Sequence, residues 1–153
     1  PNSVYPPYAF PLFAPFFITD SEFVARLTLA TFSLIALLAI ATFGFRELSF
    51  ASWQGQALGA VAGVAIAHNS SALAFGQFSI VCMGLLALQL HYLRRGGNLA
   101  AGFCWALAMI KPQIAIAFAL PFLLERRWHG LVFGLALLAA LSAFTCYYTR
   151  VSP

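Results

Sequence analysis

Charged residues are scarce in this chain of 153 residues. Only 8% of the residues are charged, whereas about a quarter are charged in an average soluble domain. Hydrophobic residues make up 62% of the chain, and the mean hydropathy is +0.89. A soluble fold of this size could not cover so much leucine, alanine and phenylalanine with so few charged side chains. The composition therefore excludes an ordinary soluble domain.

The sequence patterns of the common soluble enzyme sites are also missing. There is no glycine-rich phosphate loop, no Ser-His-Asp set and no His, Cys, Asp or Glu cluster with metal-ligand spacing. Cys82, Cys104 and Cys146 lie far apart within apolar runs, which indicates small buried hydrophobic residues rather than a disulfide framework. The net charge of +4 comes from arginines in short turns, which is not typical of a nucleic-acid-binding surface. We expect no metal, no cofactor and no nucleic-acid partner.

Apolar runs that approach or exceed the roughly 20 residues needed to span a bilayer recur along the chain. These runs do not alternate with polar residues, as the strands of a membrane barrel would. We therefore expect an all-α, polytopic transmembrane helical bundle, forming one domain over residues 1–153 of a multi-pass plasma (inner) membrane protein. Because the chain begins at Pro1 without a methionine or signal peptide and ends just after an apolar run, we expect an internal fragment of a longer protein.

Six helical segments are expected between residues 23 and 148. They cover residues 23–45, 49–67, 72–92, 99–110, 114–124 and 130–148. Residues 1–20 are rich in proline and aromatics, and we predict an irregular or interfacial segment there. Small residues four apart, at Gly55, Gly59 and Gly63 and again at Gly130 and Gly134, predict faces where another helix packs closely.

The positions of the arginines predict the topology. Arg46, Arg94-Arg95 and Arg126-Arg127 belong in cytoplasmic turns by the positive-inside rule. Residues 99–110 and 114–124 must then go out and come back as a hairpin. Each arm offers about 18 Å of helix, short of the roughly 30 Å hydrocarbon core. One kinked span over residues 99–124 would place Arg126-Arg127 outside, and we reject it for that reason.

This hairpin carries Lys111 toward the non-cytoplasmic side. Counted along helices, Lys111 lies about 24 Å from Arg95 and Gln77 about 26 Å from Arg94, so the two share one depth. An intramembrane lysine costs about 2.5 to 3.5 kcal/mol on insertion scales and by default indicates a functional site. No acidic residue of the chain has a span position that could pair with it. Its partner is then an anionic ligand or a residue elsewhere in the protein; alternatively, Lys111 anchors in the outer headgroups.

Four short motifs carry a family resemblance. They are Tyr5-Pro6-Pro7, AFGQFS (Ala74 to Ser79), the YLRRG turn (Tyr92 to Gly96) and AMIKPQ (Ala108 to Gln113), the last followed by ERRW. On these residues the chain resembles the polyprenol-phosphate-dependent membrane glycosyltransferases of the GT-C superfamily, most closely glycosyltransferase family 87. The order and spacing of the motifs match that family over nearly the whole chain.

The resemblance implies transfer, with inversion, of a mannose- or arabinose-like sugar. The donor would be a polyprenyl-phosphate sugar and the acceptor a lipid or glycan on the non-cytoplasmic face, as in cell envelope biosynthesis. Lys111, Gln113, Gln77 and Tyr5 are the implied lipid-phosphate-binding residues, in contact with membrane lipids. The family's catalytic aspartate precedes the Tyr-Pro-Pro motif and so lies outside this chain. Asp20 and Glu22 follow that motif and do not match it, so the catalytic base stays unassigned.

Two other classes of function compete with this interpretation. Broken helices and an intramembrane charge also mark transporters and other lipid-handling membrane proteins, which would show a related inverted half elsewhere in the protein. A structural bundle subunit without a site would use Lys111 only as an anchor. An acidic external loop just upstream of Pro1 would favour the transferase.

Overall fold

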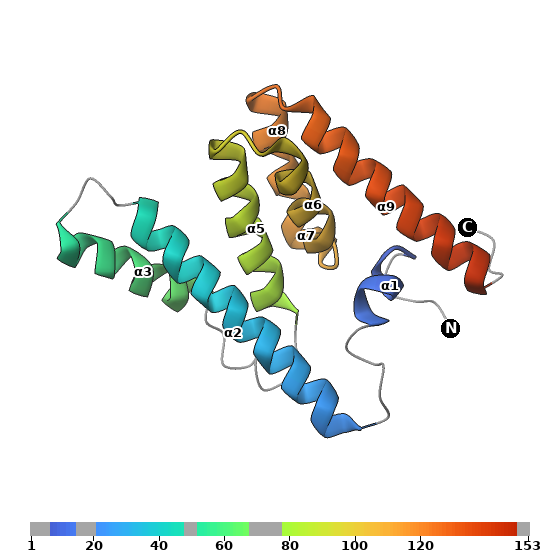
Figure 1. The fold of residues 1–153 in the computed structure, drawn as a ribbon, viewed down its shortest axis with the longest axis horizontal. Helices are drawn as coiled ribbons and strands as arrows, with labels where there is room; N and C mark the ends of the chain where they lie inside the picture. The colour runs from blue at the N-terminus through green and yellow to red at the C-terminus, as the bar shows by residue number, and fades with distance from the viewer. Residues whose placement is uncertain (1–6, 15–20, 48–51, 68–77, 150–153) are drawn as a thin grey trace.

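The structure is a computed structural model, and it describes residues 7–14, 21–47, 52–67 and 78–149. Within these ranges every regular element is a helix, which confirms the all-α prediction for this part of the chain (Figure 1). The elements are α1 (Ala9–Phe13), α2 (Glu22–Glu47), α3 (Trp53–Ala67), α5 (Ser79–Arg94), α6 (Asn98–Ala108), α7 (Pro112–Ala115), the 3-10 helix η2 (Ile116–Ala119), α8 (Leu120–Leu124) and α9 (Trp128–Thr149).

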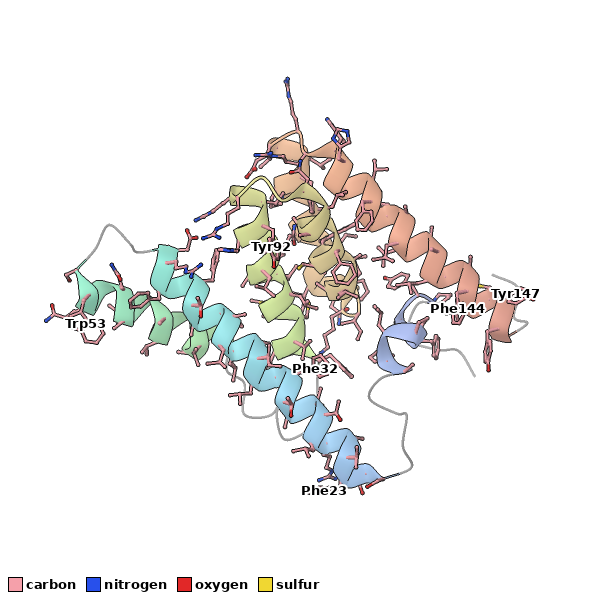
Figure 2. All side chains as sticks on the ribbon, viewed as in Figure 1. Phe23, Phe32, Trp53, Tyr92, Phe144 and Tyr147 are labelled. Carbon is pink, nitrogen blue, oxygen red and sulfur yellow. The ribbon has the colours of Figure 1, made fainter. Side chains whose placement is uncertain are left out.

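Two helices, α2 and α9, are long and apolar enough to cross a membrane. They flank the shorter helices α5 to α8 in Figure 1. Large apolar side chains such as Phe23, Phe144 and Tyr147 are exposed on them (Figure 2). Hydrocarbon is a compatible environment for such a surface. The helices α3 and α5, with 15 and 16 residues, are shorter than a full span, and the number of spans stays a prediction.

Two segments differ from the sequence-based expectation. The helix α5 begins at Ser79, after the turn residue Phe78, whereas the sequence predicts a helix from residue 72. Residues 72–77 lie outside the described residues. The first segment contains the short helix α1, where an irregular chain was predicted. Pro11 is tolerated because it lies in the first turn, where a backbone N–H has no partner within the helix. The dense prolines therefore shorten this helix and do not abolish it.

The predicted basic turns gather at one end of the bundle. Glu47, at the end of α2, forms an ion pair with Arg94 at the end of α5, and the Arg94 guanidinium lies 5.6 Å from the centre of the Phe43 ring. At the starts of α6 and α9, a Cβ on Gly130 would lie only 2.6 Å from the carbonyl oxygen of Asn98. Nitrogen-bearing side chains accordingly collect at the top of Figure 2. The grouping of the arginine turns is confirmed.

The chain between these turns forms the predicted hairpin. The helix α6 runs away from the basic end, and α7, η2 and α8 return to it (Figure 1). The indole Nε1 of Trp105 in α6 donates a hydrogen bond of 3.0 Å to the carbonyl oxygen of Ala115 in α7, so the two arms lie side by side. A single kinked span over residues 99–124 is therefore excluded.

The small residues predicted to allow close packing lie at helix contacts. A Cβ on Gly44 would lie 2.5 Å from the carbonyl oxygen of Gly59, which brings α2 and α3 into backbone contact. A Cβ on Gly134 would lie 2.8 Å from the Trp105 ring, and Gly102 faces Gly130 in the same way between α6 and α9. The predicted packing role of Gly59, Gly130 and Gly134 is confirmed.

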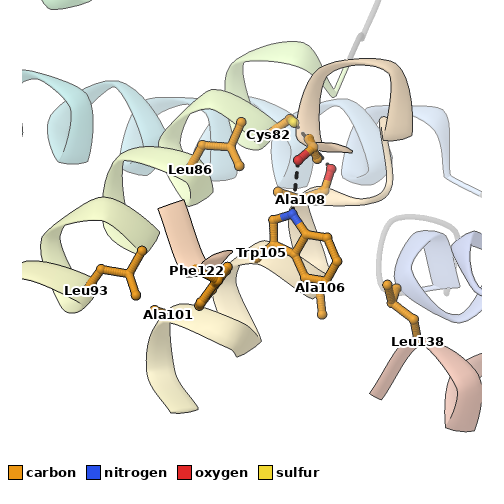
Figure 3. Close-up of a cluster of buried hydrophobic side chains, with 10 residues drawn as sticks. Cys82, Leu86, Leu93, Ala101, Trp105, Ala106, Ala108, Phe122 and Leu138 are labelled. Atoms are coloured by element: carbon orange, nitrogen blue, oxygen red, sulfur yellow. Dashed lines mark hydrogen bonds between the residues drawn. The ribbon is translucent and has the colours of Figure 1, made fainter. Parts of the chain in front are cut away.

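The main core lies between α5, α6, the returning arm and α9. The rings of Trp105 and Phe122 meet edge to face, with centroids 6.1 Å apart. Figure 3 shows the buried set around them: Cys82, Leu86, Leu93, Ala101, Trp105, Ala106, Ala108, Ala115, Phe122 and Leu138. Because this core fixes both arms of the hairpin against α5, it also fixes the position of the turn that carries Lys111.

Candidate functional site

The turn that presents Lys111 follows from its local sequence. The helix α6 ends at Ala108, and Lys111 adopts φ −121° and ψ 82°. A residue before proline is driven into this extended region because the proline ring disfavours the α conformation there. Pro112 then opens α7 at a position where a missing N–H costs nothing. The Lys-Pro pair thus reverses the chain and places the lysine at the tip of the hairpin.

The Lys111 ammonium is held by a hydroxyl from another helix. Its Nζ donates a hydrogen bond of 2.7 Å to the Oγ of Ser79, the first residue of α5. Arg94 lies at the opposite end of α5, so the hydrogen bond places Lys111 at the end of the bundle remote from the arginine turns. Lys111 itself is half-buried.

No carboxylate neutralises this ammonium within the described part of the chain. The three described carboxylates each pair with an arginine, in the pairs Glu22–Arg26, Glu47–Arg94 and Glu125–Arg127. A serine hydroxyl orients the lysine without cancelling its charge. A half-buried cation in this state attracts an anion, since an uncompensated charge away from bulk water is costly.

Side chains of α5 complete the hydrogen bonds that the prolines of the returning arm leave open. In a continuous helix, position 112 would donate to the carbonyl of Ala108, but proline has no N–H. Cys82 Sγ instead donates to that oxygen at 3.3 Å, and Lys111 N donates to it at 3.1 Å. The freed carbonyl is thus satisfied inside the protein, as non-helical backbone within a membrane would require.

The second proline is compensated in the same way. The backbone N–H of Leu120 donates to the carbonyl of Ala117, three residues back. The next bond of this 3-10 pattern would run from position 121 to Phe118, and Pro121 cannot make it. Gln89 Nε2 supplies the donor instead, 2.7 Å from the Phe118 oxygen. Ser79, Cys82 and Gln89 therefore form a polar stripe on α5 that holds the broken hairpin.

Replacing Trp105 by phenylalanine is expected to destabilise the hairpin by about 1–3 kcal/mol, because the buried Ala115 carbonyl loses its donor. Thermal unfolding of the full-length protein in detergent, followed by size-exclusion chromatography, measures the shift. The matched control is Trp53→Phe on α3, since Trp53 is 72% exposed. Equal midpoints for the two variants would contradict a structural role for the indole N–H.

The other sequence-predicted site residues divide into two groups. Gln113 is exposed in the first turn of α7, two residues from Lys111. Tyr5 and Gln77 lie outside the described residues. The described neighbours of these two motifs approach each other: the Phe13 ring of α1 lies 4.9 Å from the ring of Phe78, which precedes Ser79. The part of α1 that follows Tyr5-Pro6-Pro7 thus reaches the start of α5.

Sequence reasoning passed over Ser79 as a site residue, although it ends the AFGQFS motif. Counting helical rise could have found it. Ser79 lies about 22 Å from Arg94 along α5, as near to the depth of about 24 Å expected for Lys111 as Gln77 is. No three His, Cys, Asp or Glu side chains cluster as metal ligands within the described ranges.

Comparison with known proteins decides the family. The model of glycosyltransferase family 87 matches residues 4–153. The chain belongs to glycosyltransferase family 87. Neither a curated protein nor a solved structure matches it. As a family 87 member it is a membrane glycosyltransferase, with a sugar donor and an acceptor as its substrates.

Proposed function

We propose that this family 87 chain holds the phosphate of a polyprenyl-phosphate sugar donor on Lys111. In this proposal the protein transfers a mannose- or arabinose-like sugar to a lipid or glycan acceptor on the non-cytoplasmic face of the plasma (inner) membrane. The observation that carries it is the hydrogen bond of 2.7 Å from Lys111 Nζ to Ser79 Oγ, at the end of the bundle remote from the arginine turns. A cation fixed there without a carboxylate partner among the described residues suits a lipid-linked anion.

The charge change in the reaction explains why a lysine is useful. The acceptor hydroxyl attacks the anomeric carbon of the sugar, and the bond from that carbon to the phosphate oxygen breaks. The bond's electron pair goes to the phosphate, so a phosphodiester with one negative charge becomes a monoester with up to two. A positioned ammonium stabilises this developing charge more than it stabilises the bound donor, which lowers the barrier.

The remaining roles fall to other groups. The proton of the acceptor hydroxyl goes to a carboxylate base on another part of the protein. Gln113, beside Lys111, and Gln77 and Tyr5 are proposed as hydrogen-bonding neighbours of the phosphate. Ser79 orients the lysine and does not itself touch the donor. Family membership favours this transferase over the transporter alternative.

Cysteine labelling in the full-length protein tests the location of the phosphate site. A Gln113→Cys variant is expected to react with a membrane-impermeant maleimide added from the non-cytoplasmic side, since Gln113 is exposed. Donor lipid at about ten times its Kd should slow this labelling about ten-fold, because bound donor covers the turn.

Two further cysteine variants act as controls. Tyr147→Cys, at the far end of α9 from its basic start, should label from the same side and show no protection by donor, since Tyr147 is 87% exposed on another helix. Glu125→Cys, in the turn between α8 and α9, should stay unlabelled in sealed vesicles. Equal labelling of Gln113→Cys with and without donor would overturn the phosphate site.

A further inference from the structure

A second candidate ligand site lies at the basic end, away from Lys111. The helices α2 and α5 approach closely where a Cβ on Gly84 would lie 2.5 Å from the Cβ of Ala36. Nearer to their C-terminal ends they enclose a cavity of about 290 Å³. Its lining runs along both helices from apolar to polar residues: Leu38, Ala39, Thr42, Phe43 and Arg46 on α2, and Ala87, Leu88, His91 and Tyr92 on α5.

The polar end of this groove is positively charged. Arg46 lines it and is exposed, and it has no ion-pair partner among the described residues. The nearby Glu47 forms an ion pair with Arg94, whose guanidinium lies over the Phe43 ring. Arg95 lies close enough to act electrostatically on His91 together with Arg46. Three arginines against one glutamate leave two net positive charges at the groove mouth.

The carbonyl ends of α2 and α5 do not cancel this charge. Each helix C-terminus carries a partial charge of about −0.5, and that field falls off within the last turn. The full positive charge of Arg46 therefore dominates at this end of the groove, with His91 as a second polar side chain. At the other end of the groove, Leu38, Ala87 and Leu88 offer only apolar surface.

We propose that this groove binds an anionic diacyl phospholipid. Its phosphate contacts Arg46 and His91, and one acyl chain lies between α2 and α5 along Leu38 and Ala87. The lining changes from positively charged residues at one end of the groove to apolar residues at the other. This order matches a lipid whose headgroup lies at the basic end and whose chain runs toward the membrane centre. Basic pockets between membrane helices select anionic headgroups in this way. The site is separate from Lys111, which lies at the opposite end of α5.

Native mass spectrometry of the full-length protein in detergent tests the proposal. The probes are phosphatidylglycerol and phosphatidylcholine with identical acyl chains, added together. The native protein is expected to retain phosphatidylglycerol in preference. Arg46→Gln should lower that preference about five-fold, the effect of one arginine on an anionic headgroup. Ala87→Leu, which fills the groove and leaves the charge unchanged, should lower retention of both lipids.

Arg26→Gln is the matched control, because it removes the same charge from the far end of α2, where Arg26 pairs with Glu22. It should leave lipid retention unchanged. Equal retention of the two lipids by the native protein would overturn the proposal. An equal loss of lipid preference in Arg26→Gln and Arg46→Gln would also overturn it, because the effect would then come from net charge alone. Unchanged lipid retention in Ala87→Leu would overturn it as well, because the lipid would then not occupy the groove.

Discussion

Lys111→Met in the full-length enzyme is expected to lower kcat for sugar transfer by about 10²–10³-fold, the cost of removing one preorganised group that faces developing charge. The variant should stay folded and inserted, because methionine removes a charge that would cost about 2.5 to 3.5 kcal/mol inside a membrane. The measurement is transfer from a radiolabelled polyprenyl-phosphate sugar under saturating donor. A loss confined to KM would mean that the lysine binds donor and transition state equally.

Conservative variants separate charge from position in this prediction. Lys111→Arg keeps the cation and should retain more activity than Lys111→Met. Ser79→Ala keeps the lysine but frees it from its hydrogen bond, so it should cost about 10-fold, the lower end of the range for a hydrogen bond to a charged group. Arg26→Met, which removes an exposed cation paired with Glu22, should change nothing. Full activity in Lys111→Met would rule out the phosphate role.

The sequence was sufficient to predict the hairpin because charge decides topology in a membrane. The arginine pairs after residues 93 and 125 had to lie at one end, and the contact of Gly130 with Asn98 places the starts of α6 and α9 together as that required. The packing faces at Gly59 and Gly130 could also be predicted, because small residues four positions apart in an apolar helix are typical of close helix–helix contacts.

Two features could not be read from composition and periodicity. The start of α5 at Ser79 could not be predicted from hydropathy, because the sequence of residues 72–78 is largely apolar, like that of the helix. The hydrogen bonds from Cys82 and Gln89 to the hairpin join residues that are 26 and 29 positions apart in the sequence. No local sequence pattern predicts a contact between residues so far apart. Cys82 was expected to be a small buried hydrophobic residue; it is buried, but it also donates to the carbonyl that Pro112 leaves open.

The candidate site was predictable in part. The Lys-Pro pair and its depth followed from helical rise and the pre-proline constraint, and the structure places Lys111 at the end remote from the arginine turns. The choice of Gln77 as its neighbour rested on a similar depth counted along the helix and on the family resemblance. Ser79 makes the contact because the first residue of a helix projects its side chain from the helix end, next to the facing turn.

Gly102→Ala is expected to be the most damaging single-methyl substitution for the fold. A Cβ at this position would lie 2.2 Å from the carbonyl oxygen of Gly130 and 3.2 Å from its Cα, so α6 and α9 must move apart. Backbone cannot yield as a flexible side chain does, and overpacking of this kind costs about 1–3 kcal/mol or more. Thermal unfolding in detergent measures the loss. Ala136→Leu adds more volume at an exposed position of α9 and should leave the midpoint unchanged.

The same substitution links the fold to the site. The helix α6 ends three residues before Lys111, so a shift of α6 away from α9 moves the ammonium relative to Ser79. Misplacing a reacting group by about 1 Å can cost about 10²-fold in rate. Gly102→Ala is therefore expected to lose transfer activity even at temperatures where it remains folded, whereas Ala136→Leu keeps both stability and activity. Normal activity in a folded Gly102→Ala protein would mean that α9 does not position the lysine.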